Sequence, residues 1–175
     1  MPVLIIYATT EGQTQKIARF CADELTRAGH SVELLAAADA DAPDPARHPS
    51  AILAGSVHAG AYQGSLVDYA AKHATVLNGM KTLFLSVSLS AAGDDTGDWD
   101  GLRRIVEEFT SQTGFTPGRV EHVAGAFRFT QYDFLKSWAM RWIAAQRKQT
   151  VDPKADKEYT DWARLAAVLK EWAPA

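Results

Sequence analysis

The amino-acid sequence predicts an α/β fold, a three-layer sandwich in which a five-stranded parallel sheet is covered by helices on both faces. Short, continuous apolar runs rich in β-branched residues alternate with segments whose apolar residues recur at helical spacing. Strands that are buried on both faces have this composition, and right-handed crossovers place the intervening helices over the sheet. The 175 residues have the length of one domain, so we expect residues 1–175 to form a single domain.

Five apolar runs are the expected strands. They are "VLIIYA" (3–8), "SVELLA" (31–36), "AILAGS" (51–56), "TLFLSVS" (82–88) and "VEHVAGAF" (120–127). Helical spacing of apolar residues predicts the helices, over 17–25, 66–76, 102–109 and 162–172. The connection at 37–50 contains three prolines, so we expect no full helix between the second and third strands.

Composition and charge exclude several classes of protein. A net charge of −3 and an isoelectric point near 5.9 provide no general attraction for nucleic acid. The single cysteine, Cys21, excludes a disulfide framework, indicates a reducing compartment such as the cytoplasm, and is expected in the core. Residues 1–8 lead directly into a turn and are interpreted as a strand, not a signal peptide. No stretch has the roughly 18 to 20 apolar residues of a transmembrane helix.

The turn after the first strand has the composition of a phosphate site. "YATTEGQTQKIA" (7–18) runs from a strand into a helix through three hydroxyl side chains and one glycine. A helix N-terminus with unpaired N–H groups, surrounded by hydroxyls, forms a neutral cradle for a phosphate dianion. Neither the G-x-G-x-x-G pattern nor a Walker pattern is present, which disfavours a dinucleotide or a nucleoside triphosphate. The simpler interpretation is that Thr10 only caps the helix.

Two further loops leave the same edge of the predicted sheet. "GSVHAGAY" (55–62) follows the third strand, and "SVSLSAAGD" (86–94) follows the fourth. Both are rich in small residues, which let backbone N–H groups approach a flat ring closely. The acidic stretch "GDDTGDWD" (93–100) comes next, where we expect Asp98 to cap the following helix and Asp94 and Asp95 to be solvated.

These features together resemble the flavodoxin-like fold, with strand order 2-1-3-4-5. More narrowly, four segments are similar to the quinone-dependent protoporphyrinogen IX dehydrogenases of bacterial haem synthesis: "AKHATVLNGM" (71–80), "FLSVSL" (84–89), "VAGAFRF" (123–129) and "YTDW" (159–162). The resemblance implies FMN as cofactor, bound at the switch between strands one and three. It implies protoporphyrinogen IX as substrate and a membrane quinone as electron acceptor.

The resemblance also implies the cofactor site. The expected phosphate-binding residues are Thr9, Thr10, Glu11, Gly12, Gln13 and Thr14. The residues expected to border the isoalloxazine ring are Val57, His58, Ala59, Gly60, Ser86, Val87, Ser88 and Leu89. Arg128 is the cation expected to meet a substrate propionate. Hydride transfer needs no protein nucleophile or metal, so we expect no catalytic side chain and no metal site.

About thirty residues (128–158) are inserted between the last strand and the last helix. Within them, 134–148 is a basic amphipathic stretch in which Phe134, Trp138 and Trp142 are four residues apart. Three uses of this stripe stay open: peripheral contact with the inner face of the cell membrane or with an apolar ligand, packing on the protein's own surface, and a homodimer interface. Three alternative functions also stay open: a flavodoxin-like electron carrier, an NAD(P)H:quinone or azo-dye reductase, and a signalling or scaffold domain that binds no flavin.

Overall fold

The computed structural model describes residues 2–39, 43–127 and 157–175. Within these ranges the elements are β1 (Val3–Ala8), α1 (Gln13–Arg27), β2 (Val32–Ala36), the 3-10 turn η1 (Pro45–Arg47), β3 (Ser50–Ser56), α2 (Gly64–Asn78), β4 (Lys81–Ser88), the 3-10 turn η2 (Ser90–Ala92), α3 (Thr96–Thr113), β5 (Arg119–Ala124), β6 (Ala126–Phe127), β7 (Lys157–Glu158) and α5 (Trp162–Trp172). The predicted α/β sandwich is confirmed.

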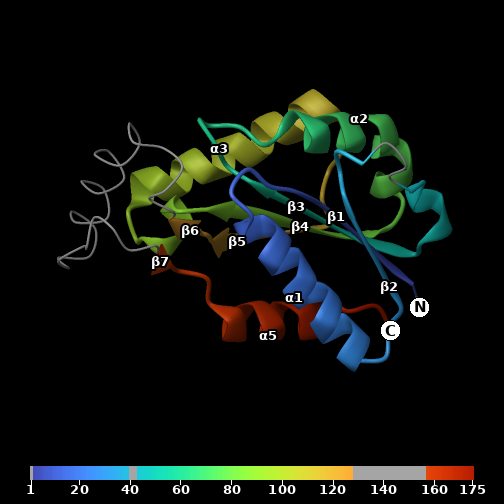
Figure 1. The fold of residues 1–175 in the computed structure, drawn as a ribbon. Helices are drawn as coiled ribbons and strands as arrows, with labels where there is room; N and C mark the ends of the chain where they lie inside the picture. Colours follow the sequence, from blue (N-terminus) through green and yellow to red (C-terminus); the bar gives the residue numbers. More distant parts are fainter. Residues whose placement is uncertain (1, 40–42, 128–156) are drawn as a thin grey trace.

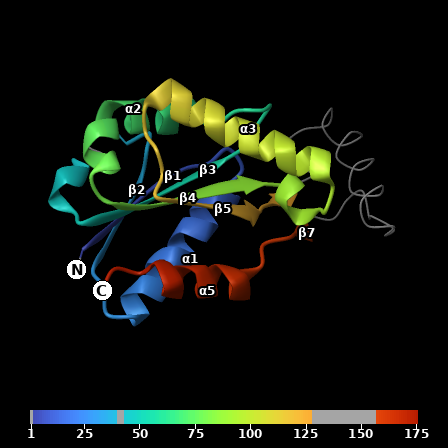
Figure 2. The same cartoon turned by 180° about the vertical axis from the view of Figure 1, so that it is seen from behind.

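The five long strands form one parallel sheet in the order β2-β1-β3-β4-β5. Helices α1 and α5 cover one face, and α2 and α3 cover the other (Figure 1, Figure 2). The strand order reverses between β1 and β3, and in such sheets ligands bind beyond the carboxyl ends of the strands at this point. The sheet therefore places the loops after β1, β3 and β4 together at one edge.

The core consists of two apolar layers, one on each face of the sheet. Val3 and Ile5 of β1 pack toward α1 and α5, whereas Leu4 and Ile6 pack toward α2 and α3, and all four are fully buried. This alternation explains why the strand is apolar throughout. Cys21 lies in the first layer, as predicted, and burial raises the pKa of its thiol to about 12.

The last predicted strand is divided. Residues 120–127 were expected to form one strand, but β5 ends at Ala124, and Ala126–Phe127 pair instead with β7 in a separate antiparallel sheet. The break is at Gly125, whose N–H donates to the carbonyl of Ser88 at 3.0 Å. A Cβ at Gly125 would meet Val87 Cγ1 at 3.3 Å, so the close approach favours glycine. The β6–β7 pairing brings together the two ends of the segment 128–156.

The structure corrects the predicted start of one helix and agrees with the prediction for the connection between β2 and β3. Helix α3 begins at Thr96, capped by Asp95, whose Oδ1 accepts from the N–H of Asp98 at 3.0 Å. Asp98 is therefore the capped residue, not the cap, because the helix starts at Thr96, three positions before the start that a cap at Asp98 implies. Between β2 and β3 the described residues contain only η1, in agreement with the proline content.

Gly55→Ala is expected to destabilise the protein by about 1–3 kcal/mol, as small-to-large substitutions do in packed cores. A Cβ at this position would overlap the buried side chain of Leu66 and approach Tyr62 Cδ1 at 3.2 Å. Urea unfolding of the apo-protein measures the change. Gly64→Ala is the matched control, because a Cβ there meets nothing within 4 Å. Equal stability of the two variants would show that the packing at Gly55 is not tight.

Candidate functional site

The turn after β1 presents an uncapped helix N-terminus. Gly12 is the N-cap of α1, with a φ of 93° that favours glycine, and no side chain caps the helix. Thr10 is thus not the cap, and its Oγ1 accepts a hydrogen bond from Gln63 Nε2 at 3.0 Å. Thr9 Oγ1 instead accepts from the N–H of Gly12 at 2.9 Å, which stabilises the turn before the helix starts.

Thr14 supplies the second feature of an anion site. Its side chain is 1 % exposed, and its hydroxyl has no hydrogen-bond partner in the structure. Buried hydroxyls are normally paired, so an orphaned one on the first turn of an uncapped helix is a donor available for a ligand. Lys16, on the same turn, has its ammonium engaged by Glu158 at 2.5 Å. The donor set is therefore neutral and fits a phosphate dianion.

The loop after β3 is a tight hairpin turn. His58 and Ala61 exchange both backbone hydrogen bonds, at 2.8 and 3.1 Å. The two central residues, Ala59 and Gly60, have φ values of 49° and 80°, as type I′ turns require. His58, Ala59 and Gly60 are exposed, and the N–H of Val57 donates to the carbonyl of Val87 at 2.8 Å. The loop therefore projects from the sheet edge while its base is fixed to β4.

The predicted residues of the fourth strand are mostly inside the protein. Ser86, Val87 and Ser88 belong to β4 and are buried, and only Leu89 lies beyond the strand. The Ser86 hydroxyl is hydrogen-bonded to the Tyr62 hydroxyl at 2.7 Å, and burial raises the pKa of Tyr62 to about 12. The side chain of Ser86 thereby joins β4 to Tyr62, the last residue of the loop 55–62.

Beyond Leu89 the chain continues as η2, and the indole of Trp99 contacts the residue that follows this turn. Trp99 Nε1 donates to the carbonyl of Gly93 at 2.9 Å, and its ring contacts that of His122 edge to face. Burial lowers the pKa of His122, which favours the neutral imidazole beside the indole. Tyr62 and Trp99, the aromatic residues nearest these loops in sequence, are thus both engaged in internal contacts.

Gln63 connects two of the loops and was not predicted as a site residue. Its Nε2 donates to Thr10 Oγ1 at 3.0 Å and to Ser56 Oγ at 2.6 Å, and its Oε1 accepts from the N–H of Ser56 at 3.3 Å. One side chain therefore crosses from the end of β3 to the turn after β1, at the point where the strand order reverses.

Gln63→Leu is expected to weaken FMN binding about threefold to tenfold, because the two loops lose a polar link worth about 1 kcal/mol per hydrogen bond. Fluorescence titration with FMN measures the affinity, and hydrogen exchange of the amides in 9–14 measures the loosened turn. Gln112→Leu, an exposed change at the far end of α3, is the control. Unchanged affinity and exchange in Gln63→Leu would mean that the link does not organise the site.

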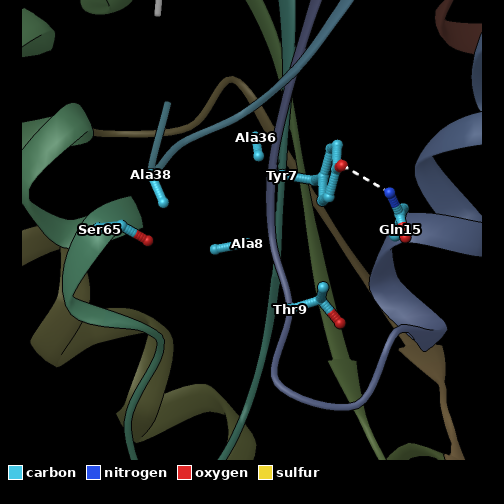
Figure 3. Close-up of a pocket in the computed structure, with 7 residues that line it drawn as sticks. All are labelled: Tyr7, Ala8, Thr9, Gln15, Ala36, Ala38 and Ser65. Carbon is cyan, nitrogen blue, oxygen red and sulfur yellow. Dashed lines mark hydrogen bonds between the residues drawn. The ribbon is translucent and has the colours of Figure 1, made fainter. Parts of the chain in front are cut away.

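A pocket of about 170 Å³ opens beside the turn at 9–14 (Figure 3). It is lined by Tyr7, Ala8, Thr9, Gln15, Ala36, Ala38 and Ser65. Tyr7 points toward α1, where its hydroxyl accepts from Gln15 Nε2 at 2.8 Å, and Ala8 lies on the other side of β1. The pocket shares only Thr9 with the predicted site and adjoins β2, so it is separate from the loops after β3 and β4.

The strand order β2-β1-β3-β4-β5, with an uncapped helix after β1, defines the flavodoxin-like class of α/β fold. A family model described as "Flavodoxin domain" matches residues 4–154, and the chain belongs to this family. Family membership indicates FMN as the cofactor, and the neutral donors around Thr14 fit its phosphate. Solved structures agree on the fold: a flavodoxin from Streptococcus pneumoniae TIGR4 has a TM-score of 0.58 at 20% identity, covering 99% of this chain and 98% of that one. Oxidised flavodoxin 2 from Bacillus cereus has a TM-score of 0.54 at 20% identity, covering 71% and 85%.

Curated relatives are more specific. A protein named protoporphyrinogen IX dehydrogenase [quinone] from Escherichia coli strain K12 is 27% identical over 173 residues, covering 99% of this chain and 95% of its own length. A protein of the same name from Leishmania major is 26% identical over 174 residues, covering 97% and 74%. These relatives support an oxidoreductase family for the chain.

Proposed function

We propose that this protein oxidises protoporphyrinogen IX to protoporphyrin IX, with FMN as cofactor and a membrane quinone as electron acceptor. The observation that carries the proposal is the extent of similarity to the Escherichia coli dehydrogenase, which spans 173 residues. The similarity covers 99% of this chain and 95% of the relative, so the two proteins are related over nearly their whole lengths. A minimal flavodoxin-like core does not need the segment 128–156 between its last strand and last helix.

The described residues divide the binding of FMN between three loops. The backbone N–H groups of the turn at 9–14 and the Thr14 hydroxyl would hold the phosphate. The exposed hairpin at 57–61 and the residues from Leu89 onward would border the ring. When bound, FMN supplies the redox chemistry that joins oxidation of the tetrapyrrole to reduction of the quinone.

The protein contributes position and access to this chemistry. No nucleophile or metal ligand is assigned, because hydride transfer requires neither. Tyr62 is 7% exposed and Trp99 is hydrogen-bonded to Gly93, so the aromatic residues nearest in sequence to the loops after β3 and β4 make internal contacts. This arrangement supports a flavin face that is open to a large, flat substrate.

Other parts of the proposal concern residues outside the described ranges. Arg128 and the stripe at 134–148 both lie there. We propose that Arg128, one position beyond β6, meets a propionate of the substrate. Contact of 134–148 with the inner face of the cell membrane, where quinone is available, is proposed from its basic and aromatic composition. Within the described residues, none of the helices is both long and apolar enough to cross a bilayer.

A steady-state assay tests the proposed activity against the alternatives. FMN-loaded protein is given protoporphyrinogen IX with a water-soluble quinone, and porphyrin fluorescence is followed under anaerobic conditions. We expect quinone-dependent porphyrin formation and no comparable oxidation of NADH or NADPH. Rapid NAD(P)H oxidation without porphyrin formation would indicate a quinone reductase. Activity with neither donor, combined with electron exchange with a flavodoxin reductase, would indicate a carrier.

A further inference from the structure

Residues 158–162 lie against the first turn of α1, and we call this segment the brace. It begins in β7 and ends in the first residue of α5, on the face of the sheet that α1 and α5 share (Figure 1). The N–H of Tyr159 donates to the carbonyl of Gly125 at 3.0 Å, which fixes the brace to the end of β5. Its contacts with α1 come from Glu158, Thr160 and Trp162.

Thr160 joins the end of β5 to the start of α1. Its hydroxyl donates to the carbonyl of Ala124 at 2.6 Å and accepts from Gln13 Nε2 at 3.0 Å. A hydroxyl has one proton, so donation to the carbonyl leaves its lone pairs to receive the amide. Gln13 is the first residue of α1 and is 6 % exposed. The bond therefore fixes a buried side chain directly beside Thr14.

A second layer of contacts holds Lys16 and Trp162. The Lys16 ammonium is paired with Glu158 at 2.5 Å and lies 5.3 Å from the centre of the Trp162 ring. Trp162 Nε1 donates to Glu158 Oε1 at 2.7 Å, and its ring packs on Phe20. Burial alone would raise the pKa of Glu158, but the hydrogen bonds from Lys16, Trp162 and Gln13, together with the charge of Lys16, outweigh it and lower the pKa.

This engagement of Lys16 has a consequence for the anion site. With the cation of the turn held by the brace, the site depends on N–H groups and one hydroxyl. Neutral donors act over short distances and must converge on the ligand, whereas a cation attracts from further away. The geometry of the first turn of α1 therefore matters more here than in a lysine-containing loop.

We propose that Thr160 is a positioning residue for the cofactor phosphate: by holding Gln13, it keeps the first turn of α1 in the geometry that binds FMN. The inference rests on the assignment of the turn at 9–14 to the phosphate. It gives a role to the "YTDW" segment, which the proposed function leaves without one.

Comparing FMN with riboflavin tests the role of Thr160, because riboflavin lacks only the phosphate. Apo-protein carrying Thr160→Val is titrated with each flavin, using quenching of flavin fluorescence. We expect the affinity for FMN to fall about tenfold, the effect of losing one hydrogen bond near a charged ligand, and that for riboflavin to stay within about twofold. Thr160→Ser retains the hydroxyl and is expected to restore the preference for FMN.

Thr113→Val is the matched control. The Thr113 hydroxyl also donates to a carbonyl, that of Phe109 at 2.8 Å, and accepts from an N–H, that of Phe115 at 3.1 Å. It is buried at the opposite end of the sheet, so its loss is expected to lower stability without changing the ratio of FMN to riboflavin affinity. A fall of that ratio in Thr113→Val equal to the fall in Thr160→Val would overturn the positioning role.

The remaining outcomes distinguish an error in the phosphate assignment of the turn from an error in the role of Thr160. If the unmodified protein binds FMN no more tightly than riboflavin, the phosphate assignment of the turn is wrong. If it prefers FMN and Thr160→Val keeps that preference in full, only the role of Thr160 is wrong. Should Thr160→Val fail to fold, Gln13→Met breaks the same contact from α1. An undiminished preference for FMN in that variant would likewise contradict the proposal.

Discussion

Thr14→Val is expected to weaken FMN binding by about 10- to 100-fold while leaving the apo-protein at least as stable as the unmodified chain. Hydrogen bonds to charged groups are worth about 1.5–3 kcal/mol, which corresponds to this range of affinity. The Thr14 hydroxyl is buried and has no partner in the structure, so its replacement by an isosteric methyl removes an unsatisfied polar group. The affinity for FMN should therefore fall without a fall in the free energy of unfolding of the apo-protein.

Two control variants on the same helix test whether the loss of FMN affinity is due to the Thr14 hydroxyl. Thr14→Ser retains the hydroxyl and should bind FMN within a few-fold of the unmodified protein. Thr26→Val removes an exposed hydroxyl that donates to the carbonyl of Ala22 at 2.7 Å, near the other end of α1, and should leave FMN affinity unchanged. Denaturant unfolding of apo-proteins and FMN titration are the two measurements. A Thr14→Val variant that binds FMN normally would exclude the hydroxyl from the phosphate site.

Replacing residues 128–156 by Asn-Gly is expected to abolish porphyrinogen turnover and preserve FMN binding. The design follows from β6 and β7, in which Phe127 pairs with Lys157 in antiparallel register. A two-residue Asn-Gly turn connects such a pair without altering the strands. The variant retains the turn at 9–14, the hairpin at 57–61 and the brace. We expect turnover with protoporphyrinogen IX and quinone to fall by at least about 100-fold, since the proposed substrate and membrane contacts are removed.

The control for this replacement is a second variant that keeps the segment but changes its stripe. Trp138→Ser with Trp142→Ser leaves the chain length unchanged and removes the two indoles of 134–148. If membrane contact is their role, this variant should lose activity with quinone in vesicles and keep activity with a water-soluble quinone. Full turnover by the Asn-Gly variant would remove the insertion from the mechanism.

Local patterns in the sequence predicted most of the fold because the sheet is buried on both faces. The runs 3–8 and 82–88 match β1 and β4 to within one residue, since a doubly buried strand leaves an uninterrupted apolar signal. The division after Ala124 was not predictable in this way. It depends on the packing of Gly125, between β5 and β6, against Val87 of β4, which is distant in sequence.

The candidate site shows the same difference between local and distant interactions. The turn at 9–14 was expected from its own residues, and the structure adds that its helix is uncapped and that Thr14 is unpaired. Gln63 and Thr160 contact this turn across 53 and 147 positions of sequence, so no local pattern indicates them. Only the "YTDW" resemblance drew attention to Thr160, without assigning it a contact.

The most direct test of the account is a single anaerobic mixing experiment with FMN-loaded protein and protoporphyrinogen IX. Flavin absorbance and porphyrin fluorescence are recorded together, with and without a membrane quinone. The account predicts rapid loss of oxidised-flavin absorbance, porphyrin formation, and recovery of the absorbance only when quinone is present. Flavin that stays oxidised in the presence of the porphyrinogen would contradict the proposed dehydrogenase activity and leave a flavodoxin-like FMN protein with a different partner.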